Sequence, residues 1–465
     1  MSSTSQFNIF AKSNLIYIPL SITIAHTLNF IVNSPLSTWQ KFPPELPNSV
    51  YSSIFFTPML LFISLTFEPI RTKKLFYVLL SLALLFLSIP LIYRGNKLPL
   101  HNIFVIIASN YGLKMFLFLK FHRTYNNQKN SKEFKSYLWS LFNWRFDSYI
   151  IPPNSENSNE KEKSLIIKSP TTSQINKKLF KCFIIIIAKW LILEFTSSTY
   201  IISTKWATEI PEKVFQVRLL EFFTKGITPS ITIFSILHML HFFAIVYLWL
   251  TINYHVFVFI IAIIFRLFFH STSEKNHYKP ILIQHGLLTP TEYVSLKEWM
   301  ISFIFNTKSL FNEPWMASSP RDFWSTRWQL FLSETFKELG FLPVRNLLIP
   351  FVPRKIANMM GVLGAFAISS LLHEYLIIGN YNIWTGEQTF FFMIHGVIFI
   401  LWEVIFGYEK KNEITLVKRF LKWGLLLIIN LLVFPAFIEP SLRNYELSSI
   451  PTFTTFYFQR FINNL

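Results

Sequence analysis

Long apolar runs separated by short polar connectors make up most of this chain. A helix that crosses a membrane needs about 20 mostly apolar residues. Runs near that length lie at residues 14–33, 51–67, 75–93, 103–121, 179–202, 227–251, 256–270, 357–378, 389–407 and 420–438. The stretch 227–270 is too long for one span, so we expect a turn near residues 253–255. The pattern predicts an all-α polytopic membrane protein.

One polar interruption divides the chain into three predicted parts. Residues 1–121 would form the N-terminal transmembrane helices, residues 122–178 a polar cytoplasmic loop, and residues 179–465 the core, which contains the motif region 312–378. The middle of the loop, at 151–164, is rich in Asn, Ser, Glu and Lys and is predicted to be flexible.

The basic residues lie mostly in the connectors, which sets an orientation by the positive-inside rule. Clusters within 71–74, 123–178 and 410–419 would be cytoplasmic. To bring the basic segment 321–355 to the same side, residues 294–305 must cross again or re-enter the membrane. Re-entrant backbone is tolerated only where protein or water surrounds it. We therefore predict about 9 to 11 transmembrane or re-entrant helices around a central tunnel.

Composition narrows the class of protein. Of 465 residues, 52% are hydrophobic and 15% are charged, against about 25% charged in an ordinary globular protein. This excludes disorder, a coiled coil and a simple cytosolic enzyme. Cys182 is the one cysteine, so neither an internal disulfide nor a cysteine-rich zinc module is possible. The basic residues behind the net charge of +18 lie mostly between apolar runs. Anionic lipid headgroups or an anionic cofactor are therefore the expected partners, and nucleic acid is not.

The most distinctive polar segment is 312–331. Ser319 and Pro320 favour a helix start, and Asp322 in the first turn suits the positive end of the helix dipole. Two neighbouring faces of that helix would carry its bulky side chains: Phe323, Arg327 and Leu330 on one, Trp324 and Trp328 on the other. These residue types also fit a plainer interpretation, an aromatic belt at the membrane surface with snorkelling arginines.

A second motif ends an apolar helix with two ionisable residues. Small residues such as Gly361 and Gly364 allow close helix packing, and His373 and Glu374 follow. Ionisable residues at membrane depth are expensive and mark functional sites, although a helix-end histidine bonded to a backbone carbonyl is the structural alternative. A zinc protease would need a second histidine where Ile377 stands.

The remaining intramembrane histidines indicate no metal site. His238 and His241 are three residues apart, but no carboxylate or cysteine accompanies them. His395, on the helix after His373, is expected to share its cavity.

Together the two motifs resemble a known family. The run Trp315-Met-Ala-Ser-Ser-Pro-Arg-Asp-Phe-Trp-Ser-Thr-Arg-Trp328, followed by Ser369-Ser-Leu-Leu-His-Glu-Tyr375, is similar to the wax synthase-like branch of the membrane-bound O-acyltransferase family. Its members look like S-x-x-D-F-W-G-R-R-W followed by a small-residue helix that ends in S-G-L-x-H-E. Ser325 stands where the family has glycine.

The resemblance implies acyl transfer from acyl-CoA to a lipophilic alcohol in the endoplasmic reticulum membrane, as in wax ester synthesis. His373 matches the catalytic histidine and would take the alcohol proton as general base. Gln329 occupies a second polar position that is usually Asn or His, and would stabilise the oxyanion. The predicted substrate-binding residues are Asp322, Trp324, Arg327, Trp328, Glu374, Arg321 and Arg345. Acyl-CoA is the expected co-substrate, with no tightly bound cofactor and no metal.

Alternatives stay open at this point. One is an O-acetyltransferase that acts on a terpenoid or sterol. Another is a lipid or solute transporter in which His373 and Glu374 form a proton relay. A catalytically inactive family member is a third, because Gln329 departs from the usual residue.

Overall fold

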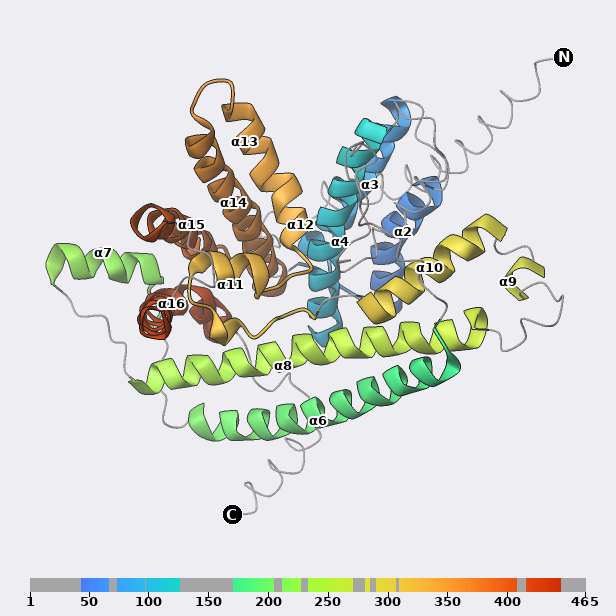
Figure 1. Cartoon of the computed structure of the whole chain (residues 1–465), viewed down its shortest axis with the longest axis horizontal. Helices are drawn as coiled ribbons and strands as arrows, with labels where there is room; N and C mark the ends of the chain where they lie inside the picture. The colour runs from blue at the N-terminus through green and yellow to red at the C-terminus, as the bar shows by residue number, and fades with distance from the viewer. Residues whose placement is uncertain are drawn as a thin grey trace. The chain divides into compact units, whose positions relative to one another are not determined.

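The computed structural model describes residues 43–66, 73–96, 98–125, 170–204, 211–226, 233–270, 281–284, 290–306, 309–407 and 415–444. Nearly all of them are helical (Figure 1), which confirms the all-α prediction. The predicted run 14–33 and the predicted flexible segment 151–164 lie outside the described residues.

Seven described helices are long and apolar enough to cross a membrane. They are Asn48–Thr66, Lys73–Ile92, Leu100–Lys120, Ile233–Phe269, Arg354–Tyr381, Glu387–Phe406 and Leu416–Asn444. Each contains or overlaps an apolar run predicted from the sequence, so the polytopic architecture is confirmed for this part of the chain. The predicted re-entrant segment 294–305 forms a helix, α10 (Pro290–Asn306).

The chain divides into two compact units. The first unit comprises Met1–Asn126 with Ile378–Ile383, and the second comprises Asn127–Ile377 with Trp384–Leu465. Two helices extend into the predicted loop 122–178: α4 runs to Tyr125, and α6 begins at Thr172.

The first unit is a set of three helices, α2 (Asn48–Thr66), α3 (Lys73–Ile92) and α4 (Leu98–Tyr125). Two-residue strands β1 (Glu45–Leu46) and β2 (Arg94–Gly95) pair in parallel beside them. Phe55 and Phe104 stack at 4.3 Å between ring centroids in the core.

A buried polar chain ties the returning segment 378–383 to this unit. His101 Nε2 donates to the carbonyl of Gly379 at 2.7 Å, so its Nδ1 accepts from the Tyr51 hydroxyl at 2.9 Å. Both nitrogens of the His101 imidazole are therefore hydrogen-bonded, as is usual for buried polar groups.

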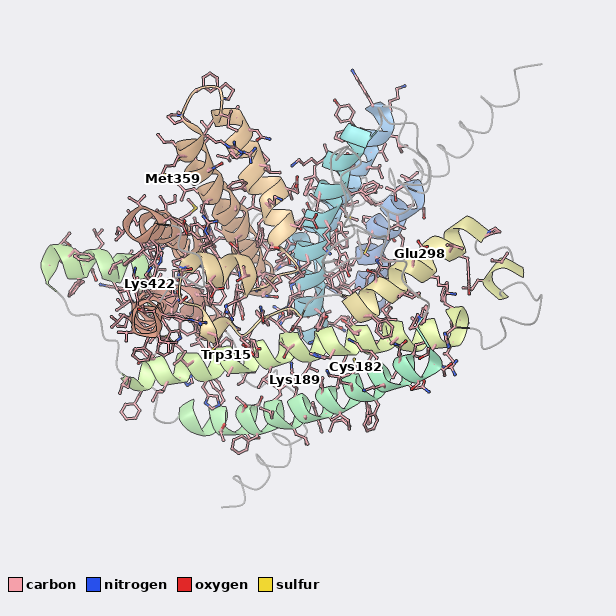
Figure 2. The ribbon with its side chains drawn as sticks, in the orientation of Figure 1. Cys182, Lys189, Glu298, Trp315, Met359 and Lys422 are labelled. Carbon is pink, nitrogen blue, oxygen red and sulfur yellow. The ribbon has the colours of Figure 1, made fainter. Side chains whose placement is uncertain are left out.

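In the second unit, α6 (Thr172–Thr204) and α8 (Ile233–Ile264) lie side by side along their lengths (Figure 1). Cys182 and Lys189 mark the α6 member of this pair (Figure 2), and the Cys182 thiol packs in a core cluster with Tyr254 of α8.

The turn predicted near residues 253–255 is wrong, because α8 runs through them without a break and continues as a π-helix, Phe265–Phe269. The polar side chains there bond within the helix. Asn253 donates to the carbonyl of Trp249 at 2.8 Å, and His255 Nδ1 donates to that of Thr251 at 2.6 Å. No Gly or Pro interrupts the segment, and a long apolar helix can tilt in a bilayer.

The remaining elements of the second unit surround the motif region. They are α7 (Phe215–Lys225), α9 (Ile281–Gln284), α10 (Pro290–Asn306), η3 (Pro314–Met316), α11 (Pro320–Thr326), α12 (Ser333–Phe336), η4 (Lys337–Phe341), α13 (Leu342–Leu348), α14 (Arg354–Tyr381), α15 (Glu387–Phe406) and α16 (Leu416–Asn444). Helix α15 contacts α7, α11 and α16.

Close contact between two glycines, Gly364 of α14 and Gly340 of η4, positions the helix that carries His373. A Cβ added to Gly364 would lie 2.7 Å from the carbonyl oxygen of Gly340 in η4. The two backbones therefore meet directly, as predicted from the small residues of this helix.

Candidate functional site

The first motif forms a capped helix. The side chain of Ser319 accepts a hydrogen bond from the backbone N–H of Asp322 at 3.1 Å, and Pro320 opens α11. Both features follow the sequence prediction, since an N-cap serine satisfies one of the free N–H groups of the first turn.

The predicted length of that helix is wrong. Helix α11 ends at Thr326, and Gln329 has a left-handed backbone with φ of 41°. The chain turns back there, and the N–H of Leu330 donates to the carbonyl of Leu310 at 3.0 Å. Residues 327–330 therefore do not continue the two helical faces expected from the spacing.

Arg327 and Asp322 fix this turn. Arg327 Nε donates to Asp322 Oδ2 at 2.9 Å, and its Nη1 donates to the carbonyls of Asn312 and Glu313 at 3.1 and 3.0 Å. The guanidinium is buried. These bonds give the pair a structural role, and substrate binding by either residue stays a prediction.

The two motif tryptophans pack into aromatic clusters. Trp328 stacks on Phe243 of α8 and on Phe323, both at 5.4 Å between centroids. Trp324 packs against Phe366 of α14 at 5.5 Å and Phe392 of α15 at 5.8 Å. Trp324 thus joins α11 to the helices that surround the second motif.

Trp315, labelled in Figure 2, anchors the loop before α11. Its ring lies 6.1 Å from that of Tyr247 in α8, and its carbonyl accepts from Trp423 Nε1 of α16 at 2.7 Å. The loop that leads into the motif is held from two sides.

His373 lies buried on α14 and contacts two phenylalanine rings. Its imidazole stacks on Phe392 of α15 at 4.5 Å between centroids with 26° between planes. Phe437 of α16 lies 5.4 Å away at 64°. Nε2 is buried and has no hydrogen-bond partner among the described residues. The backbone-bonded alternative is therefore not seen for this nitrogen, which is available as a proton acceptor.

Glu374 links α14 to the start of α15. Its Oε1 accepts from the backbone N–H of Thr389 at 3.0 Å, in the first turn of α15. A carboxylate there satisfies a free helix N–H and complements the helix dipole. Its other oxygen, Oε2, is buried and without a partner in the described part of the structure.

His395 belongs to the neighbouring aromatic cluster. Its Nδ1 donates to the carbonyl of Phe391 at 2.7 Å, and Nε2 lies 3.1 Å from the Asn430 carboxamide. Trp324 lies edge-on to it at 5.3 Å. Through Trp324 and Phe392, the same rings connect the neighbourhoods of His395 and His373.

The other predicted residues lie around this cluster. Arg321 forms a bidentate ion pair with Glu403 of α15, at 2.9 and 3.2 Å, over the ring of Phe399. Arg345 of α13 lies over the ring of Phe341. His373 Nε2 has no hydrogen-bond partner among the described residues, so Gln329 does not bond to it there and their cooperation stays a prediction.

A buried charge cluster was not predicted from the sequence. Glu387 at the start of α15 accepts from the backbone N–H of Phe215 at 2.7 Å and pairs with Arg443 of α16. Glu439 of α16 pairs with Arg218 of α7. The ionisable residues within apolar α16 were the available signal, and the cluster fastens α7 to α15 and α16.

No group of three or more potential metal ligands occurs in the part of the chain that the structure describes. His238 Nε2 lies 3.0 Å from the Tyr200 hydroxyl, and His241 Nε2 donates to the carbonyl of Thr196 at 2.8 Å. Both histidines join α8 to α6.

Known proteins match the region of the chain that contains these residues. Residues 307–394, which contain both motifs and the ring cluster around His373, match the membrane bound O-acyl transferase family. The chain is 38% identical over 87 residues to a probable long-chain-alcohol O-fatty-acyltransferase 3 of Arabidopsis thaliana, which is 18% of this chain and 25% of the relative. It is 27% identical over 189 residues to a probable long-chain-alcohol O-fatty-acyltransferase 8 of the same plant, which is 39% of this chain and 56% of the relative.

The match to a long-chain-alcohol O-fatty-acyltransferase of Simmondsia chinensis is 38% over 91 residues, 19% of this chain and 25% of the relative. The chain thus matches between a quarter and about half of the length of these relatives. The motif region of this chain is thus similar to the membrane bound O-acyl transferase family and, within it, to long-chain-alcohol O-fatty-acyltransferases. With seven apolar helices of membrane-spanning length among its described residues, the chain is an integral membrane protein.

Proposed function

We propose that this protein is an acyl-CoA-dependent O-acyltransferase that esterifies the hydroxyl of a lipophilic alcohol, as in wax ester synthesis. The observation that carries the proposal is the buried His373, whose Nε2 has no partner among the described residues and whose ring is held by Phe392 and Phe437. The segment 307–394 that contains it is the part that matches the family.

The reaction requires a base that accepts the alcohol proton and later donates it to the leaving group. The neutral imidazole of His373 accepts the alcohol proton at Nε2 while the alcohol oxygen bonds to the thioester carbonyl carbon. The tetrahedral intermediate then collapses, the carbon–sulfur bond breaks, and the CoA thiolate takes the proton from His373. The products are an ester and CoA, and the histidine is unchanged. General-base help of this kind contributes about 10² to 10⁴-fold.

The surroundings of His373 favour ester formation over hydrolysis. Aromatic rings from α11, α15 and α16 contact one another in an apolar cluster beside His373, formed by Trp324, Phe392 and Phe437. Exclusion of water from such a site suppresses thioester hydrolysis, the competing reaction.

Two further roles belong to the proposal. The Gln329 carboxamide donates to the developing oxyanion. Arg345, Arg354 and Lys355 bind the phosphates of acyl-CoA at a cytoplasmic mouth. Of the other predicted arginines, Arg321 is already paired with Glu403 and Arg327 with Asp322, so these two contribute less to phosphate binding. The endoplasmic reticulum is the proposed membrane, which cofractionation with its markers tests.

The function is tested with the purified full-length protein in detergent. It is given labelled palmitoyl-CoA with a panel of fatty alcohols, a sterol and diacylglycerol, and the lipid products are separated. A labelled ester with a fatty alcohol supports the proposal. An ester found only with acetyl-CoA and a sterol or terpenoid would replace it by the acetyltransferase alternative. Vectorial flux in proteoliposomes without any new ester would indicate a transporter.

A further inference from the structure

Gln388 lies on α15 one turn before Phe392, the residue whose ring stacks on His373. Residues four apart on a helix face the same side. The Gln388 side chain is buried, with 2% of its surface exposed, and its Nε2 donates to the carbonyl of Phe437 at 2.8 Å. The Phe437 ring is the second ring beside the imidazole. Phe437 therefore contacts both residues, Gln388 through its backbone carbonyl and His373 through its ring.

The other half of the Gln388 carboxamide is unsatisfied. Its Oε1 is buried and has no hydrogen-bond partner among the described residues, and the same is true of His373 Nε2 and Glu374 Oε2. A buried acceptor without a partner costs about 1 to 3 kcal/mol, and folded proteins leave few of them.

The three unpaired atoms belong to one neighbourhood. Glu374 binds the backbone of Thr389, which follows Gln388, and His373 stacks on Phe392 one turn later. All three residues are more than nine-tenths buried. Each of these acceptors needs a donor of its own, which bound substrates at this end of α15 would supply.

We propose that Gln388 is a substrate-binding residue whose Oε1 accepts a hydrogen bond from a donor group close to the reacting atoms. This inference rests on the proposed acyltransferase function. The pantetheine arm of acyl-CoA carries such donors, its amide N–H groups near the thioester. The alcohol hydroxyl has a single proton, which His373 Nε2 accepts in the proposed reaction. A carboxamide oxygen orients a donor without removing its proton, which leaves proton transfer to His373.

Gln216 provides a matched control for Gln388. Its Nε2 also donates to a backbone carbonyl, that of Thr385, at 2.8 Å, and its Oε1 is also buried without a partner among the described residues. It lies on α7 and makes none of the ring contacts that hold His373. The variants Gln388→Met and Gln216→Met each remove one such carboxamide and keep side-chain length.

The test is steady-state ester formation by the wild type and both variants, with alcohol and palmitoyl-CoA varied separately, beside thermal unfolding of each protein. We expect Gln388→Met to raise the acyl-CoA KM about tenfold, the loss of one substrate hydrogen bond, with unfolding like that of Gln216→Met. A rise in the alcohol KM alone would contradict the assignment of the donor to the pantetheine amide.

The opposite results are distinct. If both KM values and kcat of Gln388→Met equal those of Gln216→Met, Gln388 does not bind substrate, while the acyltransferase function stands. If the wild type forms no ester, both proposals are overturned. Should Gln388→Met not fold, Gln388→Asn keeps a carboxamide but withdraws it by one methylene, and an unchanged pair of KM values there also overturns the inference.

Discussion

The imidazole of His373 lies nearly flat against the ring of Phe392, with 4.5 Å between centroids and 26° between planes. The two residues come from consecutive helices, α14 and α15. The Phe392 ring is therefore the wall that sets where Nε2 of His373 points.

Replacement of Phe392 by Leu removes this wall, and we expect kcat to fall about 100-fold, since a displacement near 1 Å can cost that much. Phe399→Leu is the matched control, because it lies two turns further along α15 and does not contact His373. Each change should cost about 1 kcal/mol of unfolding free energy. Equal rates in the two variants would show that Phe392 does not position the base.

Gln329 has a left-handed backbone with φ of 41°, which costs about 1 to 2 kcal/mol for a residue with a Cβ. We expect Gln329→Gly to raise the unfolding free energy by about 1 kcal/mol and to lower kcat about 100-fold, because the oxyanion donor is lost. Thermal unfolding and initial rates measure the two effects separately. A stabilised variant with full activity would confine Gln329 to a backbone role.

Glu374 joins α14 to α15 through the N–H of Thr389. Glu374→Ala should lower the unfolding free energy by about 1 to 2 kcal/mol, as expected for the loss of a helix-start acceptor. Glu374→Gln keeps an oxygen acceptor and should lose less. Glu403→Ala, which removes the partly exposed partner of Arg321, should cost less than about 1 kcal/mol. A Glu374→Ala variant as stable as Glu403→Ala would contradict the capping role.

Gly364 permits backbone contact between α14 and η4. A Cβ at Gly364 would lie 2.7 Å from the carbonyl oxygen of Gly340, so Gly364→Ala should destabilise the protein by about 1 to 3 kcal/mol. Gly424 of α16 has nothing within 4 Å of an added Cβ, and Gly424→Ala should be stabilising by up to about 1 kcal/mol. Opposite signs in thermal unfolding are expected, and equal shifts would refute the close contact.

Much of the helix inventory follows from apolar run length alone. The exception at residues 253–255 is instructive, because Asn253 and His255 look like turn residues but bond to carbonyls of their own helix. The 323–330 helix failed for the opposite reason. The spacing of its side chains suits a helix, but the chain turns tightly after Thr326. The Arg327 bonds to the carbonyls of Asn312 and Glu313 stabilise this turn, and no local sequence pattern predicts it.

At the site, the burial of His373 and Glu374 follows from ionisable residues at the end of an apolar helix. Their neighbours do not follow from the sequence. With 52 phenylalanines in the chain, nothing in the pattern distinguishes Phe392 and Phe437 from the rest, because the contact depends on the relative rotation of α14, α15 and α16. Gln388 was missed for the same reason.

The most direct test of the central claim is ester formation by His373→Ala beside the wild type and His238→Ala, which removes another buried histidine that stacks on Tyr200 of α6. With palmitoyl-CoA and a fatty alcohol in detergent, we predict that His373→Ala loses about 10² to 10⁴-fold in kcat, while His238→Ala stays near the wild-type rate. Ester formation by a folded His373→Ala protein at the wild-type rate would contradict the assignment of His373 as the base.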